Sequence, residues 1–172
     1  TCSHASNMGL LPPRELRRLS ERLAEYRINV VALPRTNSWL LGRHLRSTPI
    51  KRIMAPISQL QEAGVNVAIG GDNVQDPWFP GGDFDPLALM SSAMSLAQLA
   101  PWQRLGLAPF TTSAAALLEL AWDSTIRKGG PADFVLLQAG SWSEAMSTPS
   151  KRKILINGEW LDKTTISHKL SQ

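Results

Sequence analysis

An acidic residue stands at a position where α/β proteins often carry out chemistry. Asp72 directly follows the apolar segment Val65–Ile69 and the glycine pair Gly70 and Gly71. The apolar alternation predicts a strand, and the glycines allow a sharp turn after it. Strand ends form the active face of an (α/β) barrel, so an acid there favours catalysis. The alternative is that Asp72 only caps a helix or bonds within a turn.

His4 is the second candidate, at the end of a short strand predicted over residues 1–4. An imidazole can orient a water molecule while a nearby carboxylate takes the proton of that water. A divalent metal would make such water a nucleophile by lowering its pKa to about 7. A lone histidine is more often structural than catalytic. The position of this one, two elements before the Asp72 strand, favours a functional role.

The segments that must position these residues alternate between strand and helix patterns. Residues 28–33 (INVVAL) predict a buried strand, and residues 57–63, closed by Gly64, predict a helix. Leucines at helical spacing after Pro12 and Pro13 predict an earlier helix that ends near Tyr26. The order strand, helix, strand, helix, strand predicts a parallel sheet.

A functional loop and two outer helices are expected around this sheet. Residues 34–49 include polar and basic side chains such as Arg35 and Asn37, and we expect them to form a loop after the second strand. Helices are predicted over residues 87–99, after Asp85, and over residues 111–121.

The pattern changes after residue 123. Residues 132–137 (ADFVLL) predict a strand, and the polar stretch 141–150 predicts a loop. Asn157 and Gly158 lie between two short strand-like segments and predict a tight hairpin. Of the two remaining histidines, His44 is expected at the surface and His168 in a mobile polar tail.

Composition excludes several classes of protein. The chain has 172 residues, 43% of them hydrophobic, which allows one core but not a whole (β/α)₈ barrel of about 250 residues. The net charge of +4 does not indicate nucleic-acid binding, because arginines alternate with glutamates on the first helix. No apolar run is long enough for a membrane helix. A single cysteine suits a reducing, cytoplasmic setting.

Three motifs in order carry a family resemblance. SHASNM at residues 3–8, PRTNSWLLGR at 34–43 and GDNVQDPW at 71–78 resemble the amidohydrolase superfamily, and within it the cytosine deaminases. The resemblance implies the C-terminal part of a (β/α)₈ metal-dependent hydrolase barrel over residues 1–122. It also implies strands of a small β-sandwich over residues 123–172. We therefore expect a piece of a longer enzyme.

The resemblance also assigns roles to individual residues. It implies that Asp72 is the acidic metal ligand and proton shuttle, and that His4 polarises the attacking water. Trp78 matches a tryptophan that packs beside the substrate base. Asn73 is expected to bind the substrate, but the cytosine deaminase pattern has a second aspartate there, so cytosine itself is left open as the substrate.

The implied cofactor is one divalent metal ion, zinc or iron, with most of its ligands upstream of this chain. The implied substrate is a small nitrogen heterocycle that loses an amino group by hydrolysis, and a homo-oligomer is possible. Two alternatives stay open. One is a related hydrolase that releases an alkylamine from a triazine-like ring, and the other is a truncated, non-catalytic chain. With most metal ligands upstream, this chain is expected to be inactive alone.

Overall fold

The computed structural model describes residues 1–42, 53–147 and 151–161. His44 and His168 lie outside these ranges. The chain divides into two compact units, Thr1–Asp123 and Ser124–Gln172, which are described separately below. Within the described ranges, no helix is long and apolar enough to cross a membrane.

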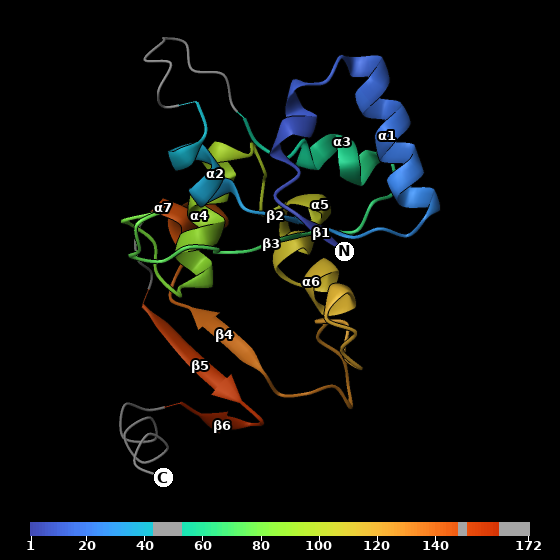
Figure 1. Cartoon of the computed structure of the whole chain (residues 1–172). Helices are drawn as coiled ribbons and strands as arrows, with labels where there is room; N and C mark the ends of the chain where they lie inside the picture. The colour runs from blue at the N-terminus through green and yellow to red at the C-terminus, as the bar shows by residue number, and fades with distance from the viewer. Residues whose placement is uncertain (43–52, 148–150, 162–172) are drawn as a thin grey trace. The chain divides into compact units, whose positions relative to one another are not determined.

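A short parallel sheet organises the first unit (Figure 1). Its strands are β1 (Cys2–Ser3), β2 (Val30–Ala32) and β3 (Val67–Ile69), in the order β1-β2-β3. Cys2 is aligned with Val30, and Val30 with Val67. The predicted parallel sheet is confirmed. All three strands point the same way, so the segments that follow them start at one edge.

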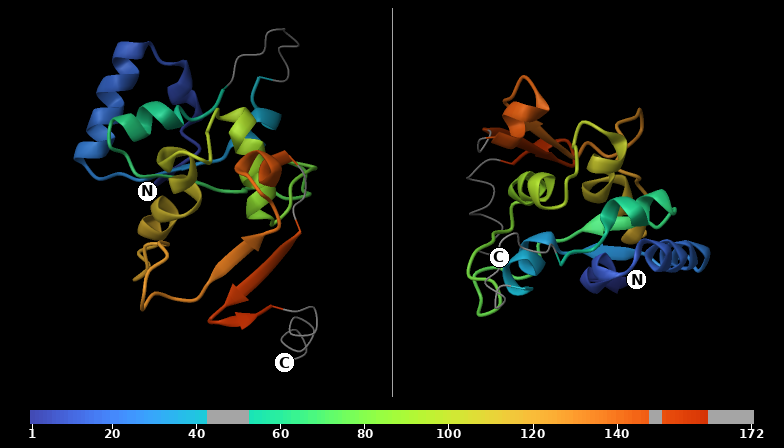
Figure 2. Two further views of the ribbon diagram at one scale, coloured as in Figure 1. Left: turned by 180° about the vertical axis from the view of Figure 1, so that it is seen from behind. Right: turned by 90° about the horizontal axis from the view of Figure 1, so that it is seen from above.

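Helices connect and flank these strands (Figures 1 and 2). α1 contacts α3, α2 contacts α4, and α6 lies against β3. The helical elements of this unit are η1 (Ser6–Leu10), α1 (Pro13–Glu25), α2 (Pro34–Leu40), α3 (Ile57–Glu62), α4 (Pro86–Leu96), α5 (Arg104–Leu107), η3 (Ala108–Phe110) and α6 (Thr112–Leu117).

The predicted start and stop signals act as expected in three places. Pro13 occupies the first turn of α1, where its missing N–H has no helical partner to lose. The Asp85 carboxylate caps α4 by accepting a hydrogen bond of 3.0 Å from the Leu87 N–H. Gly64 follows α3 with φ +89°, a left-handed conformation that glycine adopts without strain.

Two predicted loops contain helices instead. Residues 34–40 form α2, because Pro34 favours a first helical turn and the Leu33 carbonyl accepts the Asn37 N–H at 3.0 Å. Residues 142–147 form α7 (Trp142–Ser147), where the Ser141 hydroxyl accepts the Glu144 N–H as a cap does. Because both segments are rich in polar residues, the sequence analysis predicts loops there and misses the helices.

The first hydrophobic core lies around β2 and β3. Val30, Ala32, Leu60 and Val67 are completely buried, and Leu89 of α4 packs into the same cluster. Val30, Ala32 and Val67 lie in the segments whose apolar residues predict strands, and Leu60 lies in the helix predicted over residues 57–63. The core includes Ala32 and Ile69, the last residues of β2 and β3, so the polar residues begin only after the strands end.

The second unit contains an antiparallel sheet of β4 (Phe134–Leu137), β5 (Arg152–Ile156) and β6 (Glu159–Trp160). Phe134 pairs with Leu155, and Leu155 pairs with Trp160. Asn157 and Gly158 both have positive φ, 51° and 78°, as the tight two-residue turn requires. The predicted hairpin is confirmed.

Truncation of the core should be costly in free energy of unfolding. Leu60→Ala removes a side chain that is 0% exposed and should lower the free energy of unfolding by about 2–5 kcal/mol. Leu118→Ala, at a leucine 64% exposed, is the matched control and should change it by about 0.5 kcal/mol or less. Urea unfolding of the chain measures both, and equal losses would contradict this assignment of the core.

Candidate active site

The candidate residues gather where the parallel strands end. His4 directly follows β1, α2 starts two residues after β2, and Asp72 lies three residues beyond Ile69, the last residue of β3. Neighbouring strands are about 4.8 Å apart, so the ends of β1 and β3 are about 10 Å apart across β2. The sheet therefore brings two chemically active side chains to one edge.

His4 is exposed, and its ring is held on one side. Its backbone N–H donates to the Val31 carbonyl at 3.0 Å, and its φ of 63° lies in the left-handed region. The ring Nδ1 lies 3.0 Å from Nδ2 of Asn37, which is only 3% exposed. Nε2 of His4 has no partner among the described residues.

Asp72 is also exposed and adopts a left-handed φ of 59°. The turn before it is anchored because the Gly70 N–H donates to the Ala32 carbonyl at 3.0 Å. In the part of the chain that the structure describes, the Asp72 carboxylate makes no hydrogen bond or ion pair. It does not act as a helix cap or a turn acceptor there, so both oxygens are available to a ligand.

The following loop is folded around one carboxylate, that of Asp76. Its Oδ1 accepts hydrogen bonds from the backbone N–H groups of Trp78 and Phe79, at 2.9 and 2.8 Å. Its Oδ2 accepts one from Nδ2 of Asn73 at 2.5 Å. These bonds, that of Asn73 first, hold the pKa of Asp76 below its ordinary value. The Asn73 amide is thus engaged within its own loop, while the Trp78 ring is 63% exposed.

Two residues of helix α2, Arg35 and Trp39, contact this loop. Arg35 donates to Asp83 at 3.1 Å, and that hydrogen bond lowers the pKa of Asp83. The guanidinium also lies 6.0 Å from the centre of the Phe79 ring. Trp39 contacts the same ring, with centroids 6.3 Å apart. The loop after β3 is therefore fastened to the helix after β2.

Comparisons with known proteins give the family. A model of the amidohydrolase family matches residues 1–159. A pterin deaminase of Rhizobium rhizogenes strain K84 is 36% identical over 143 residues, which are 83% of this chain and 33% of that protein. The chain belongs to the amidohydrolase family.

Two solved structures of amidohydrolases resemble the fold. 5-Methylcytosine deaminase from Klebsiella pneumoniae, liganded with 5-fluorocytosine, matches with TM-score 0.80 and 27% identity, over 93% of this chain and 39% of that one. N-isopropylammelide isopropylaminohydrolase from Burkholderia multivorans matches with TM-score 0.72 and 25% identity, over 92% and 37% of the two chains. This amidohydrolase chain thus spans well under half the length of the relatives it matches.

Amidohydrolases typically use a divalent metal, and the residues here fit part of such a site. The free carboxylate of Asp72 is a suitable ligand for a hard or borderline cation. A catalytic zinc site normally takes three protein ligands. Among the described residues, no group of three or more His, Cys, Asp or Glu side chains could hold a metal ion. Further ligands would have to come from outside the described residues.

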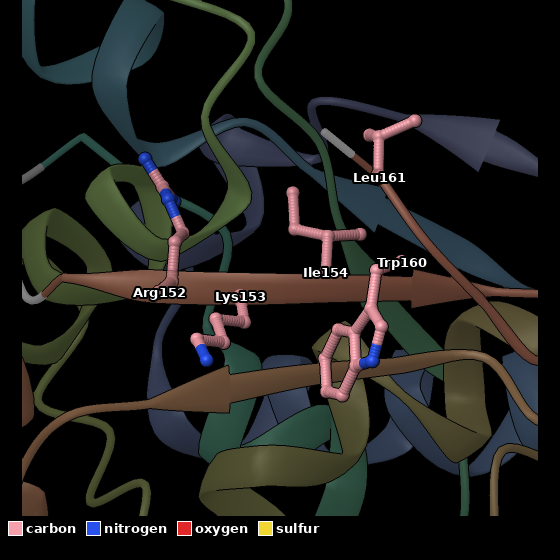
Figure 3. Close-up of a pocket in the computed structure, with 5 residues that line it drawn as sticks. All are labelled: Arg152, Lys153, Ile154, Trp160 and Leu161. Carbon is pink, nitrogen blue, oxygen red and sulfur yellow. The ribbon is translucent and has the colours of Figure 1, made fainter. Parts of the chain in front are cut away.

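The second unit contains a pocket of about 270 Å³. Figure 3 shows its lining residues, Arg152, Lys153, Ile154, Trp160 and Leu161. The Lys153 ammonium lies 5.7 Å from the centre of the Trp160 ring. No carboxylate or imidazole is among these lining residues.

The Asp76 network should make the loop sensitive to acid. Because its folded-state pKa is lowered, Asp76 stabilises the fold above about pH 3.9, the ordinary value, and that contribution is lost as pH falls through the lowered pKa. Asp76→Asn should therefore lower the melting temperature at pH 6.5, and the difference from the wild type should shrink below about pH 3.5.

Thermal unfolding at both pH values measures this difference. Glu25→Gln is the control, since Glu25 is exposed and makes no hydrogen bond or ion pair within the described ranges. A difference for Asp76→Asn that is as large in acid as at neutral pH would contradict the role of the charged carboxylate.

Proposed function

We propose that this chain forms part of the active site of a metal-dependent hydrolase that removes an amino group from a nitrogen heterocycle. The observation that carries the proposal is the placement of His4 and Asp72 at one edge of the parallel sheet in an amidohydrolase chain. The relatives named above, a pterin deaminase and a 5-methylcytosine deaminase, support an amino-substituted ring as the substrate.

The fold fits this role as part of a larger structure. We propose that residues 1–122 form the C-terminal part of a (β/α)₈ barrel, and that residues 123–172 contribute strands to a small β-sandwich. The parallel order β1-β2-β3 and the coverage of 39% of the deaminase chain support this arrangement. The remaining metal ligands would then lie on barrel strands outside this chain.

The reaction exchanges one bond for another at the ring. The oxygen of water bonds to the carbon that carries the amino group, and the carbon–nitrogen bond breaks. The products are ammonia, which takes one proton of the water, and the ring carbonyl compound, in which the second proton of the water is bound to a ring nitrogen. A bound divalent metal would make the water more acidic at neutral pH.

Asp72 and His4 have different roles toward the attacking water in this proposal. The Asp72 carboxylate would ligate the metal, take a proton from the water and return it to the leaving amine. The His4 ring would hydrogen-bond the water and orient it toward the ring carbon. Within the described ranges, the Asp72 oxygens and the Nε2 of His4 have no partner, which supports these two roles.

Trp78 is proposed to pack against the substrate ring. Its side chain is largely exposed, and its backbone is held by Asp76, so the indole presents a flat apolar face from a fixed loop. Aromatic faces of this kind stack on heterocycles and contribute apolar contact area. The described residues include no full set of metal ligands, so we propose that the chain is inactive alone.

A second candidate function is release of an alkylamine from a triazine-like ring. The similarity to N-isopropylammelide isopropylaminohydrolase favours it, because that enzyme's name describes such a reaction. The pair Asp72 and Asn73 also departs from the two aspartates of the cytosine deaminase pattern. Both candidates use the same attack of water, and they differ in the leaving amine.

Removal of the Asp72 carboxylate should stop the reaction. In the complete enzyme, Asp72→Ala should lower turnover by at least about 100-fold and reduce bound metal, because both metal ligation and proton transfer are lost. His4→Asn should lower turnover to a similar extent but retain most of the metal. Metal analysis together with ammonia release measures both effects. Retention of metal and turnover in Asp72→Ala would contradict the proposal.

Asn73→Asp tests whether this position faces the substrate. The change brings a carboxylate next to Asp76 Oδ2 and should loosen the loop, so a lower melting temperature is expected in any case. If Asn73 also contacts the ring, the ratio of kcat/KM for a cytosine and for an alkylamino-triazine should change by about 10-fold or more. An unchanged ratio with lower stability would make Asn73 a loop residue only.

A further inference from the structure

A buried amide, that of Asn37, forms a hydrogen bond with the exposed imidazole of His4. Asn37 belongs to α2, which follows the central strand, and its side chain is 3% exposed. Its Nδ2 lies 3.0 Å from Nδ1 of His4, 33 residues earlier in the chain. Its backbone is held at both groups, since its N–H donates to the Leu33 carbonyl and its carbonyl accepts from the Leu41 N–H, each at 3.0 Å.

We propose that Asn37 is a positioning residue that fixes the orientation and the tautomer of His4. The inference rests on the proposed function, in which His4 orients the attacking water. Asn37 Nδ2 carries only donors, so Nδ1 of His4 accepts and the proton of the neutral ring resides on Nε2. The Nε2–H then faces the reaction as a hydrogen-bond donor.

The placement of His4 explains why such support is needed. The residue is exposed, lies just past a two-residue strand and has a left-handed φ of 63°. No other side chain of the described ranges bonds its ring. One hydrogen bond from a buried, helix-anchored amide fixes the rotation of the ring and leaves Nε2 directed to a ligand.

Stability alone does not favour an amide at this position. The Oδ1 atom of Asn37 is buried and has no hydrogen-bond partner in the described part of the chain. A leucine of similar volume would bury no unpaired oxygen and would suit the surrounding core better. The hydrogen bond to His4, and not core packing, therefore accounts for an amide at position 37.

The tautomer can be measured directly on the 172-residue chain. Its three histidines are labelled with nitrogen-15, and the His4 signals are assigned by their loss in His4→Asn. At alkaline pH, where imidazole is neutral, the wild type should show a protonated Nε2 and a bare Nδ1. Asn37→Asp should move the proton to Nδ1, because an ionised carboxylate only accepts.

Kinetics of the complete enzyme provide the second measurement. Asn37→Leu and Asn37→Asp should each lower kcat by about 10- to 100-fold, with a much smaller change in KM. Thr36→Val is the matched control in the same helix, because Thr36 is 1% exposed and its hydroxyl has no partner in the described ranges. It should change neither the tautomer nor kcat.

A proton on Nδ1 in the wild-type chain would overturn the proposal, and this result needs no variant that might misfold. An unchanged tautomer in Asn37→Asp, or a normal kcat in Asn37→Leu, would also overturn it. Failure of the proposed function is seen separately, as normal turnover in His4→Asn, whereas the wild-type tautomer is measured independently of turnover.

Discussion

Parallel pairing of β1, β2 and β3 is the constraint on which the candidate site depends. Antiparallel neighbours would send the end of β2, and with it the start of α2, to the edge opposite the ends of β1 and β3, so Asn37 and Arg35 could not reach His4 and Asp83. With parallel pairing, all three strands end at the same edge. The completely buried Val30 and Val67 lock the register that aligns those ends.

Helix α2 connects the segments after β1 and β3 because of helical geometry. Arg35 and Asn37 are two residues apart, which places them about 200° apart around the helix axis. One side chain therefore reaches Asp83 in the loop after β3, while the other reaches His4 after β1. A short helix at the central strand can thus fasten the segments on both sides of it.

The two units differ in how local interactions determine them. The hairpin of β5 and β6 follows from two adjacent residues, Asn157 and Gly158, whose positive φ angles are needed for a tight turn. The parallel sheet has no such local device, since each pair of strands is joined through a helix. Its strands are three residues long or shorter, and they are held by burial and by the surrounding helices.

The amino-acid sequence by itself determined the order of the strands and of helices α1, α3, α4 and α6, the turns at Gly64 and Asn157, and the positions of Asp72 and His4 after apolar segments. Those features depend on local propensity and on patterns of a few residues. Only the tertiary structure decided that Asn37 bonds His4, that Arg35 bonds Asp83, and that polar residues 34–40 form a helix. Contacts between residues 33 and 48 positions apart depend on how the strands pair, which no local pattern specifies.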